Sequence, residues 1–206
     1  MRDYVVSDMS EKKFSLDPHN GDCPFLQENR RLVFENTRFN VFADRLSQLD
    51  GQRVESYMVV QPKEQTACGL AGAMVLPIRE GQFFLLNIFR HPVNQWLWEV
   101  PGGFIDEKES PEQSAARELT EETGLVCEPH DLHSLGVVCP TPGLADARIA
   151  LFYATNCHYR EPPADREMGI VDGRWFSADE MAALVLSPYA DTVSMLLYYR
   201  YLATVG

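Results

Sequence analysis

The sequence predicts an α/β (α+β) fold with a small β appendage in front of it. Apolar runs of strand length alternate with helical segments that begin at capping residues. No segment repeats at a fixed period. The 206 residues, 45% of them hydrophobic, suffice to bury one core and a smaller appendage. We therefore divide the chain into a poorly patterned segment over 1–37, a β appendage over 38–65 and a main domain over 66–206.

The first half of the chain contains four predicted strands. RFNVFADRL from residue 38 and RVESYMVV from residue 53 are typical of strands joined by a turn at 49–52. The stretches at 69–78 and 82–89 are more apolar and are separated by a hairpin signal at 79–81. We expect these last two strands to lie in the central sheet. Residues 1–37 carry little beyond a turn-like DPHNGDCP.

The best-marked helix follows at 110–124. Ser110 is a suitable N-cap, Pro111 suits the first helical position and Gln113 completes a capping box. Gly124 supplies the C-terminal stop. Three apolar side chains of this helix are expected to face the core: Ala115, Ala116 and Leu119.

The last third of the chain continues the alternation. Further strands are predicted at 134–139, 148–155 and 173–176. Ser177, with a Glu three residues later, predicts the start of a second helix, and Ser187-Pro188 predicts the start of the last one.

Charge and cysteine content exclude several classes of function. A net charge of −12 without a basic patch argues against a nucleic-acid or membrane surface. No run reaches membrane-spanning length, and the first residues lack the apolar region of a secretory signal. The five cysteines lack any C-x-x-C spacing and are expected to be reduced thiols of a cytoplasmic protein: Cys23, Cys68, Cys127, Cys139 and Cys157.

Three glutamates of the 110–124 helix point to a cation. Glu118, Glu121 and Glu122 stand at i, i+3 and i+4, where like charges cost roughly 0.2–0.5 kcal/mol per pair. A hard divalent cation offsets this repulsion, and ligands that are all oxygen suit Mg²⁺ or Mn²⁺. Arg117 can pair with Glu121. The alternative is a solvated acidic face, which leaves Gly103 and Glu109 unexplained.

These residues carry a family resemblance. Three parts of the sequence resemble the Nudix hydrolase box at every defined position: Gly103, Glu109 after five intervening residues, and, after seven more, Arg-Glu-Leu-x-Glu-Glu-x-Gly-Leu over 117–125. The resemblance implies an α/β/α sandwich with a mixed sheet and Mg²⁺-dependent hydrolysis of a nucleoside diphosphate linked to another group. It assigns catalytic roles to five residues: Glu109, Arg117, Glu118, Glu121 and Glu122.

The residues that precede the box resemble one subfamily in particular. NIFR at 87–90 and LWEVPGG at 97–103 are similar to the segments that precede the box in ADP-ribose and ADP-sugar pyrophosphatases, which more often have Ala at the position of Gly102. The resemblance implies that the Gly102 carbonyl joins Glu118, Glu122 and Glu121 as metal ligands. The substrate-binding residues are then expected to be Arg90 on the diphosphate, Glu99, Pro142 and Arg53. The alternative for Arg90 is a surface arginine at a strand end.

The general base is left open by the sequence. CPTPGLADA at 139–147 resembles the loop that carries a catalytic glutamate in this subfamily, but Asp146 is followed here by Ala147. A base must reach the attacking water within hydrogen-bond distance, which sequence does not supply. The candidates are Glu121, Asp146 and the 161–167 loop with Glu161, Asp165 and Glu167; the alternative for that loop is a solvated acidic turn.

The expected reaction is Mg²⁺-dependent cleavage of ADP-ribose, or of a related nucleoside diphosphate sugar, into a nucleoside monophosphate and a sugar phosphate. A GDP-sugar or broad-specificity hydrolase is the alternative within the class, and a non-catalytic nucleotide-binding module is the alternative outside it. The resemblance further implies a homodimer that exchanges its leading strands, with Phe34, Phe39, Arg53 or Tyr57 helping to hold a base across the interface.

Overall fold

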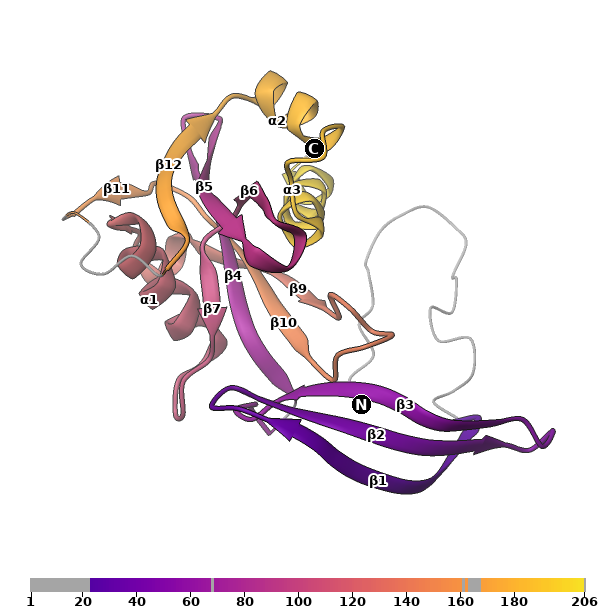
Figure 1. Ribbon diagram of the computed structural model, residues 1–206. Helices are drawn as coiled ribbons and strands as arrows, with labels where there is room; N and C mark the ends of the chain where they lie inside the picture. The colour runs from indigo at the N-terminus through magenta and orange to yellow at the C-terminus, as the bar shows by residue number, and fades with distance from the viewer. Residues whose placement is uncertain (1–22, 68, 161, 163–167, 206) are drawn as a thin grey trace, which may run out of the picture.

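The computed structural model describes residues 23–67, 69–160, 162 and 168–205, and its main domain is an α/β/α sandwich (Figure 1). A seven-stranded sheet has the order β12-β5-β4-β10-β9, with β6 added to β5 and β7 added to β4. Strands β4 and β10 are parallel and the other pairs are antiparallel, so the sheet is mixed, as predicted. Its strands are β4 (Leu70–Arg79), β5 (Gln82–Arg90), β6 (Gln95–Glu99), β7 (Gly102–Phe104), β9 (Leu132–Val138), β10 (Arg148–Ala154) and β12 (Ile170–Phe176).

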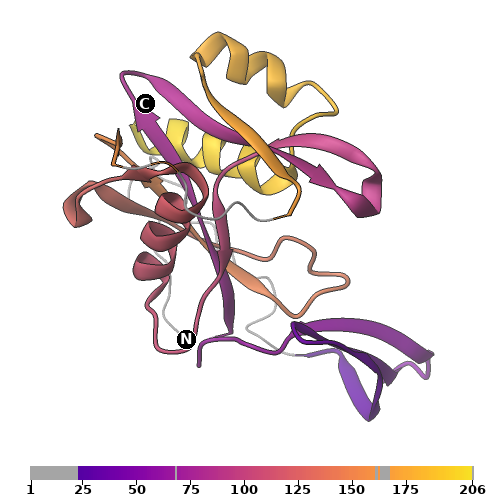
Figure 2. The ribbon, with the colours of Figure 1, turned by 60° about the vertical axis from the view of Figure 1, so that its left-hand side comes forward.

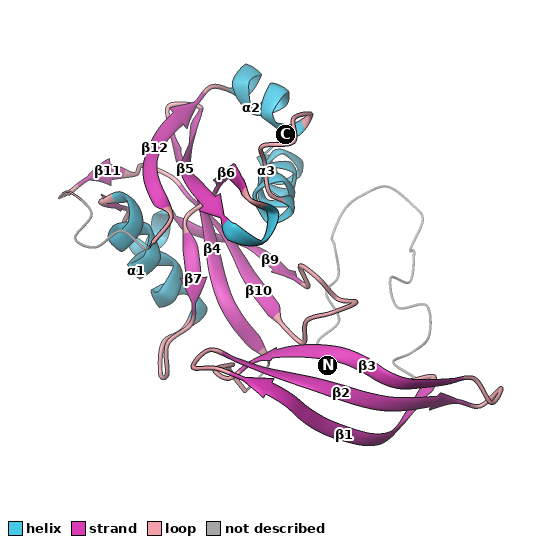
Figure 3. Cartoon of the chain, in the orientation of Figure 1, coloured by secondary structure: helices cyan, strands magenta, loops and turns pink. Residues whose placement is uncertain are grey.

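Helices cover both faces of this sheet. Helix α1 (Pro111–Thr123) lies on one side, and α2 (Ala178–Val185) and α3 (Thr192–Val205) lie on the other (Figures 1 and 3). The strands supply both cores by alternation: Ala73 and Val75 of β4 face the α1 side, whereas Leu76 and Ile78 face α2 and α3. Two short elements, β8 (Leu125–Val126) and β11 (His158–Tyr159), pair beside the end of α1.

The predicted boundaries of α1 are confirmed. The Ser110 side chain accepts a hydrogen bond from the Gln113 N–H, the Gln113 side chain accepts one from the Ser110 N–H, and Gly124 ends the helix in the left-handed conformation. Ala115 and Leu119 are buried. Ala116 is exposed instead of facing the core, because the helix turns its Ser114 side toward β7, where the Ser114 hydroxyl donates to the Phe104 carbonyl.

The last helix begins later than predicted. Ser187 closes α2 instead of opening α3, since its hydroxyl donates to the Leu184 carbonyl and accepts from the Tyr189 N–H. Asp191 performs the capping role: its carboxylate accepts from the N–H groups of Val193 and Ser194, and α3 starts at Thr192.

A second sheet of three antiparallel strands stands apart from the sandwich (Figures 1 and 2). It consists of β1 (Phe25–Glu35), β2 (Phe39–Gln48) and β3 (Arg53–Pro62). Strands β2 and β3 were predicted, but β1 falls in the poorly patterned segment over 1–37, where no strand was predicted. All residues of β1 are exposed, so its sequence lacks the alternation of a half-buried strand. Within the described residues, no helix is long and apolar enough to cross a membrane.

Candidate active site

Two carboxylates of α1 lie against the short strand β7. The Gly102 N–H donates to the Glu122 carboxylate at 2.9 Å, and Glu122 is only 4% exposed. Glu118, one turn earlier, lies over Gly103, where a Cβ atom would overlap its carboxylate. A glycine at 103 therefore leaves the room that Glu118 occupies.

The register of β7 directs the Gly102 backbone away from β4. The Val75 N–H donates to the Pro101 carbonyl, and the Ile105 N–H donates to the Ala71 carbonyl. Gly102, opposite Met74, consequently occupies a position that makes no ladder hydrogen bond with β4. The Gly102 N–H points away from β4 and toward Glu122. In this register the Gly102 carbonyl lies on the same outer edge of β7.

Gly102 also approaches β4 more closely than a side chain permits. A Cβ atom built on Gly102 would lie 2.5 Å from the Ala73 carbonyl oxygen and 2.7 Å from the Met74 Cα. Both contacts are to backbone atoms, and displacing the backbone of a packed strand is energetically costly. Glycine at 102 is thus required by packing, apart from any role of its carbonyl.

Arg117 of α1 forms ion pairs with three glutamates. Its guanidinium donates to Glu109 at 3.0 Å, to Glu118 at 2.9 Å and to Glu121 at 2.9 Å, which includes the predicted pair with Glu121. Burial opposes the charge of Arg117, but the bond to Glu109 and the charge of Glu118 outweigh it and raise the pKa of Arg117. The same bond from Arg117 lowers the pKa of Glu109.

Arg90 and Glu99 form a two-pronged ion pair across the β5–β6 hairpin. Both N–H···O distances are 2.7 Å. The Arg90 side chain is 47% exposed and the Glu99 side chain 6%. The buried carboxylate therefore anchors a guanidinium that extends toward solvent. The two predicted substrate residues are therefore one structural unit.

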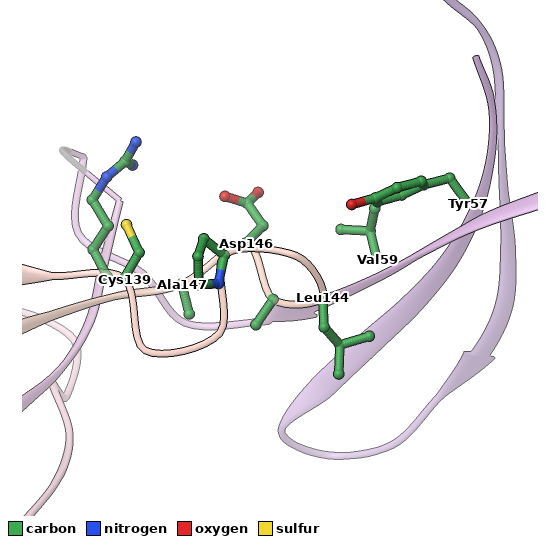
Figure 4. Close-up of a pocket in the computed structure, with 9 residues that line it drawn as sticks. Tyr57, Val59, Cys139, Leu144, Asp146 and Ala147 are labelled. Atoms are coloured by element: carbon green, nitrogen blue, oxygen red, sulfur yellow. The ribbon is translucent and has the colours of Figure 1, made fainter. Parts of the chain in front are cut away.

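A pocket of about 330 Å³ lies between β3 and the β9–β10 loop (Figure 4). The loop is docked on β3: the Val60 N–H donates to the Leu144 carbonyl, and the Asp146 N–H donates to the Val60 carbonyl. Side chains add to this contact, since Tyr57 donates to the Gly143 carbonyl at 3.0 Å and Gln61 donates to the Asp146 carboxylate at 2.7 Å. The lining residues are Tyr57, Val59, Cys139, Pro142, Leu144, Ala145, Asp146, Ala147 and Arg148.

The structure brings together some predicted residues and separates others. Pro142, Asp146 and Tyr57 share the pocket, while Arg53 lies outside its lining, 3.7 Å from Glu28 at the far end of β3. Glu121 is 53% exposed and pairs with Arg117, whereas Glu122 is buried. No group of three or more His, Cys, Asp or Glu side chains in the described part of the chain is arranged as a metal site. Glu161, Asp165 and Glu167 lie outside the described residues.

Sequence reasoning missed several contacts of this site. Gln61 and Gln65 fix the β9–β10 loop through Asp146, and Arg148 lines the pocket. The buried Ser194 hydroxyl accepts from the Val100 N–H directly before the Pro-Gly-Gly corner. Glutamines and a helix serine carry no distinctive spacing, so no sequence signal separates them from ordinary polar residues.

Comparisons with known proteins agree with the box. The family described as NUDIX domain matches residues 70–196. CMP-5'-(N-acetyl-N-hydroxy-3-aminopropyl)phosphonate hydrolase of Streptomyces rubellomurinus is 27% identical over 79% of this chain and 74% of its own length. ADP-ribose pyrophosphatase of Mycobacterium tuberculosis is 31% identical over 56% of each chain, so this chain spans little more than half of that relative.

Among solved structures, one described as the crystal structure of ADP compounds hydrolase superposes with a TM-score of 0.72. The match covers 89% of this chain and 97% of that chain at 19% identity, which shows a shared fold. The family match covers well over half of the chain, and the box runs from Gly103 of β7 through α1 to Leu125. The chain therefore belongs to the Nudix family of hydrolases.

Proposed function

We propose that the chain hydrolyses the diphosphate of ADP-ribose or a related nucleoside diphosphate sugar with Mg²⁺, giving a nucleoside monophosphate and a sugar phosphate. The contact of α1 with β7 carries this proposal. It places the buried Glu122, Glu118 and the outward backbone edge of Gly102 at one corner.

This corner fits a hard divalent cation. Its donors are carboxylate and carbonyl oxygens, which Mg²⁺ and Mn²⁺ prefer. Glu118, Glu122 and the Gly102 carbonyl would hold the cation, with Glu121 as a further ligand. A bound Mg²⁺ supplies Lewis acidity toward phosphoryl oxygens and acidifies a coordinated water.

The remaining groups of the chain orient the substrate and the ligands. Arg90, anchored by Glu99, offers guanidinium donors to the diphosphate. Arg117 holds Glu109, Glu118 and Glu121 in fixed positions through three ion pairs. The general base is Glu121 or Glu167. Asp146 is the third candidate, and its carboxylate is already engaged by Gln61.

The pocket beside β3 supports a nucleoside as one half of the substrate. Tyr57 gives it an aromatic wall (Figure 4). Pro142 of the β9–β10 loop also lines it. Similarity to an ADP-ribose pyrophosphatase supports adenine. A second candidate is a hydrolase that accepts several nucleotides, including a GDP-sugar. It is supported by the similarity, over most of the chain, to a hydrolase whose name specifies a CMP-linked phosphonate.

We further propose a homodimer built on the three-stranded sheet. Leu26, Leu32, Val33 and Phe34 of β1 and Met58 of β3 are exposed apolar side chains on this sheet. A second copy would cover such a patch. A cytoplasmic location and the absence of nucleic-acid or membrane partners remain predictions from composition.

A substrate panel tests the proposed reaction. Purified protein with Mg²⁺ is incubated with ADP-ribose, ADP-glucose, GDP-mannose, UDP-glucose, a CMP-linked sugar, diadenosine polyphosphates and dNTPs, and products are separated by ion exchange. AMP and ribose 5-phosphate from ADP-ribose alone support the specific proposal. Cleavage of several sugar nucleotides supports the broader hydrolase. Binding without any product indicates a regulatory module and overturns the catalytic proposal.

A further inference from the structure

Two cysteines far apart in sequence lie opposite each other beside the end of α1. Strands β8 and β11 pair with Val126 opposite His158 and Leu125 opposite Tyr159. The next step of this antiparallel register places Cys127 opposite Cys157. Both are free thiols; Cys157 is 1% exposed and Cys127 is half-buried.

The register also decides how close the two side chains come. The Arg160 N–H donates to the Gly124 carbonyl at 3.0 Å, which makes that pair a hydrogen-bonded one. Such pairs alternate with non-hydrogen-bonded pairs, so Cys127 and Cys157 occupy a non-hydrogen-bonded position. There Cα atoms are about 4.5 Å apart and side chains are at their closest, and disulfides span Cα separations of about 4.4–6.8 Å.

We infer that Cys127 and Cys157 form a reversible thiol–disulfide couple, a covalent modification site that reacts with peroxides. Both side chains belong to the same core cluster, and the interaction between the two thiols lowers the pKa of Cys127 and raises that of Cys157. Cys127 is the more accessible thiol and therefore the one that meets the oxidant. Cys157, which is buried and lies with its sulfur 3.4 Å from the Ala154 carbonyl oxygen, is the resolving partner.

The reaction balances with one peroxide per couple. The Cys127 thiolate attacks a peroxide oxygen, the O–O bond breaks and a sulfenic acid and one water form. The Cys157 sulfur then attacks the Cys127 sulfur, the S–O bond breaks and a second water leaves. Two thiols lose two electrons and two protons in total, and hydrogen peroxide is reduced to two waters.

The cross-link would close a loop of about 30 residues that contains β9, β10 and the pocket loop between them. The joined segments are already paired as strands, so closure needs no rearrangement. Its main effect is on the unfolded chain, and the melting temperature should rise by roughly 5–10 °C. The couple lies outside the carboxylate cluster, so this inference does not depend on the proposed reaction.

The test uses a full-length variant that retains only the couple, with Cys23→Ser, Cys68→Ser and Cys139→Ser. Folded protein is treated with a small excess of hydrogen peroxide, and intact mass, peptide maps and melting temperature are measured. The expected result is loss of two hydrogen atoms, a linked peptide joining Cys127 to Cys157, and a higher melting temperature that dithiothreitol reverses.

A matched variant adds Cys127→Ser, chosen because a substitution at the more deeply buried Cys157 risks the fold. It should lose both the cross-link and the rise in melting temperature. Addition of oxygen atoms without a cross-link overturns the inference. So does retention of both thiols in the three-serine variant, or a wild-type disulfide that uses Cys23 or Cys139 instead.

Discussion

Strands β1 and β4 are nearly equal in length but differ completely in burial. All but two of the ten residues of β4 are buried, whereas every one of the eleven residues of β1 is exposed. The register of β4 is therefore fixed by side chains that must enter two cores. The register of β1 rests on backbone pairing with β2 and on the Arg30–Asp44 ion pair at 2.7 Å. The large sheet holds the carboxylate cluster through its own packing. The small sheet is mostly exposed, and its strand β3 supplies one wall of the pocket.

Replacing Glu122 by Gln gives the largest expected effect and tests the large sheet. The amide oxygen can still accept from the Gly102 N–H, so the fold should persist, but the negative charge proposed to bind the metal is lost. We expect kcat at saturating Mg²⁺ to fall at least about 100-fold with an unchanged melting temperature. Undiminished turnover would remove Glu122 from the site.

Gly102→Ala tests how tightly β7 is packed on β4. The added methyl group would meet the Ala73 carbonyl and the Met74 backbone, which predicts destabilisation by about 1–3 kcal/mol and a melting temperature several degrees lower. Gly143→Ala is the matched control, because nothing lies within 4 Å of its Cβ position. Equal melting curves for the two variants would contradict this account.

Lysine substitutions on β1 test whether the small sheet forms the dimer interface. The double substitution Leu32→Lys and Phe34→Lys adds cations to the exposed apolar patch of β1. Because neither side chain contributes to a core, the melting temperature of the monomer should be unaffected, but dimerisation should weaken at least about tenfold. Sedimentation velocity over a range of protein concentrations measures this change. Gln27→Lys, at an exposed polar position of β1, should leave association intact; a monomeric wild type would refute the dimer.

Glu109→Gln gives the smallest effect and depends on pH. The Arg117 bond lowers the pKa of folded Glu109, so its stabilisation is present above the unfolded pKa of about 4.3 and is lost as pH falls through the folded pKa. The variant should melt about 2–4 °C below wild type at pH 7. The difference in melting temperature between the variant and the wild type should disappear at pH values below about 4. A difference that grows as the pH falls would contradict this role of Glu109.

The same difference in burial explains how far the sequence could predict the fold. Strands β4, β5, β9, β10 and β12 and helix α1 follow apolar patterns and caps, and all were predicted. Strand β1 was not, because an exposed strand leaves no alternation. The start of α3 was misplaced, since Ser187 and Asp191 are both good caps and only packing decides between them.

The site was predictable where the chemistry is local. The spacing of the box gives the α1 face and the Arg117 pairs. It could not say which of Glu121 and Glu122 faces the sheet, because that depends on how α1 is rotated against β7. It could not give the docking of the β9–β10 loop either, because Tyr57 and Gly143 are 86 positions apart.

The pairing of Val60 with the β9–β10 loop affects where the chain can be shortened. A fragment beginning at residue 70, where the family match starts, would retain every strand of the large sheet. It would lose both backbone partners that Val60 offers to Leu144 and Asp146, together with Tyr57 and Gln61. One wall of the pocket would disappear with them. The piece that contains the whole large sheet and the piece that keeps this pocket are therefore different lengths of the same chain.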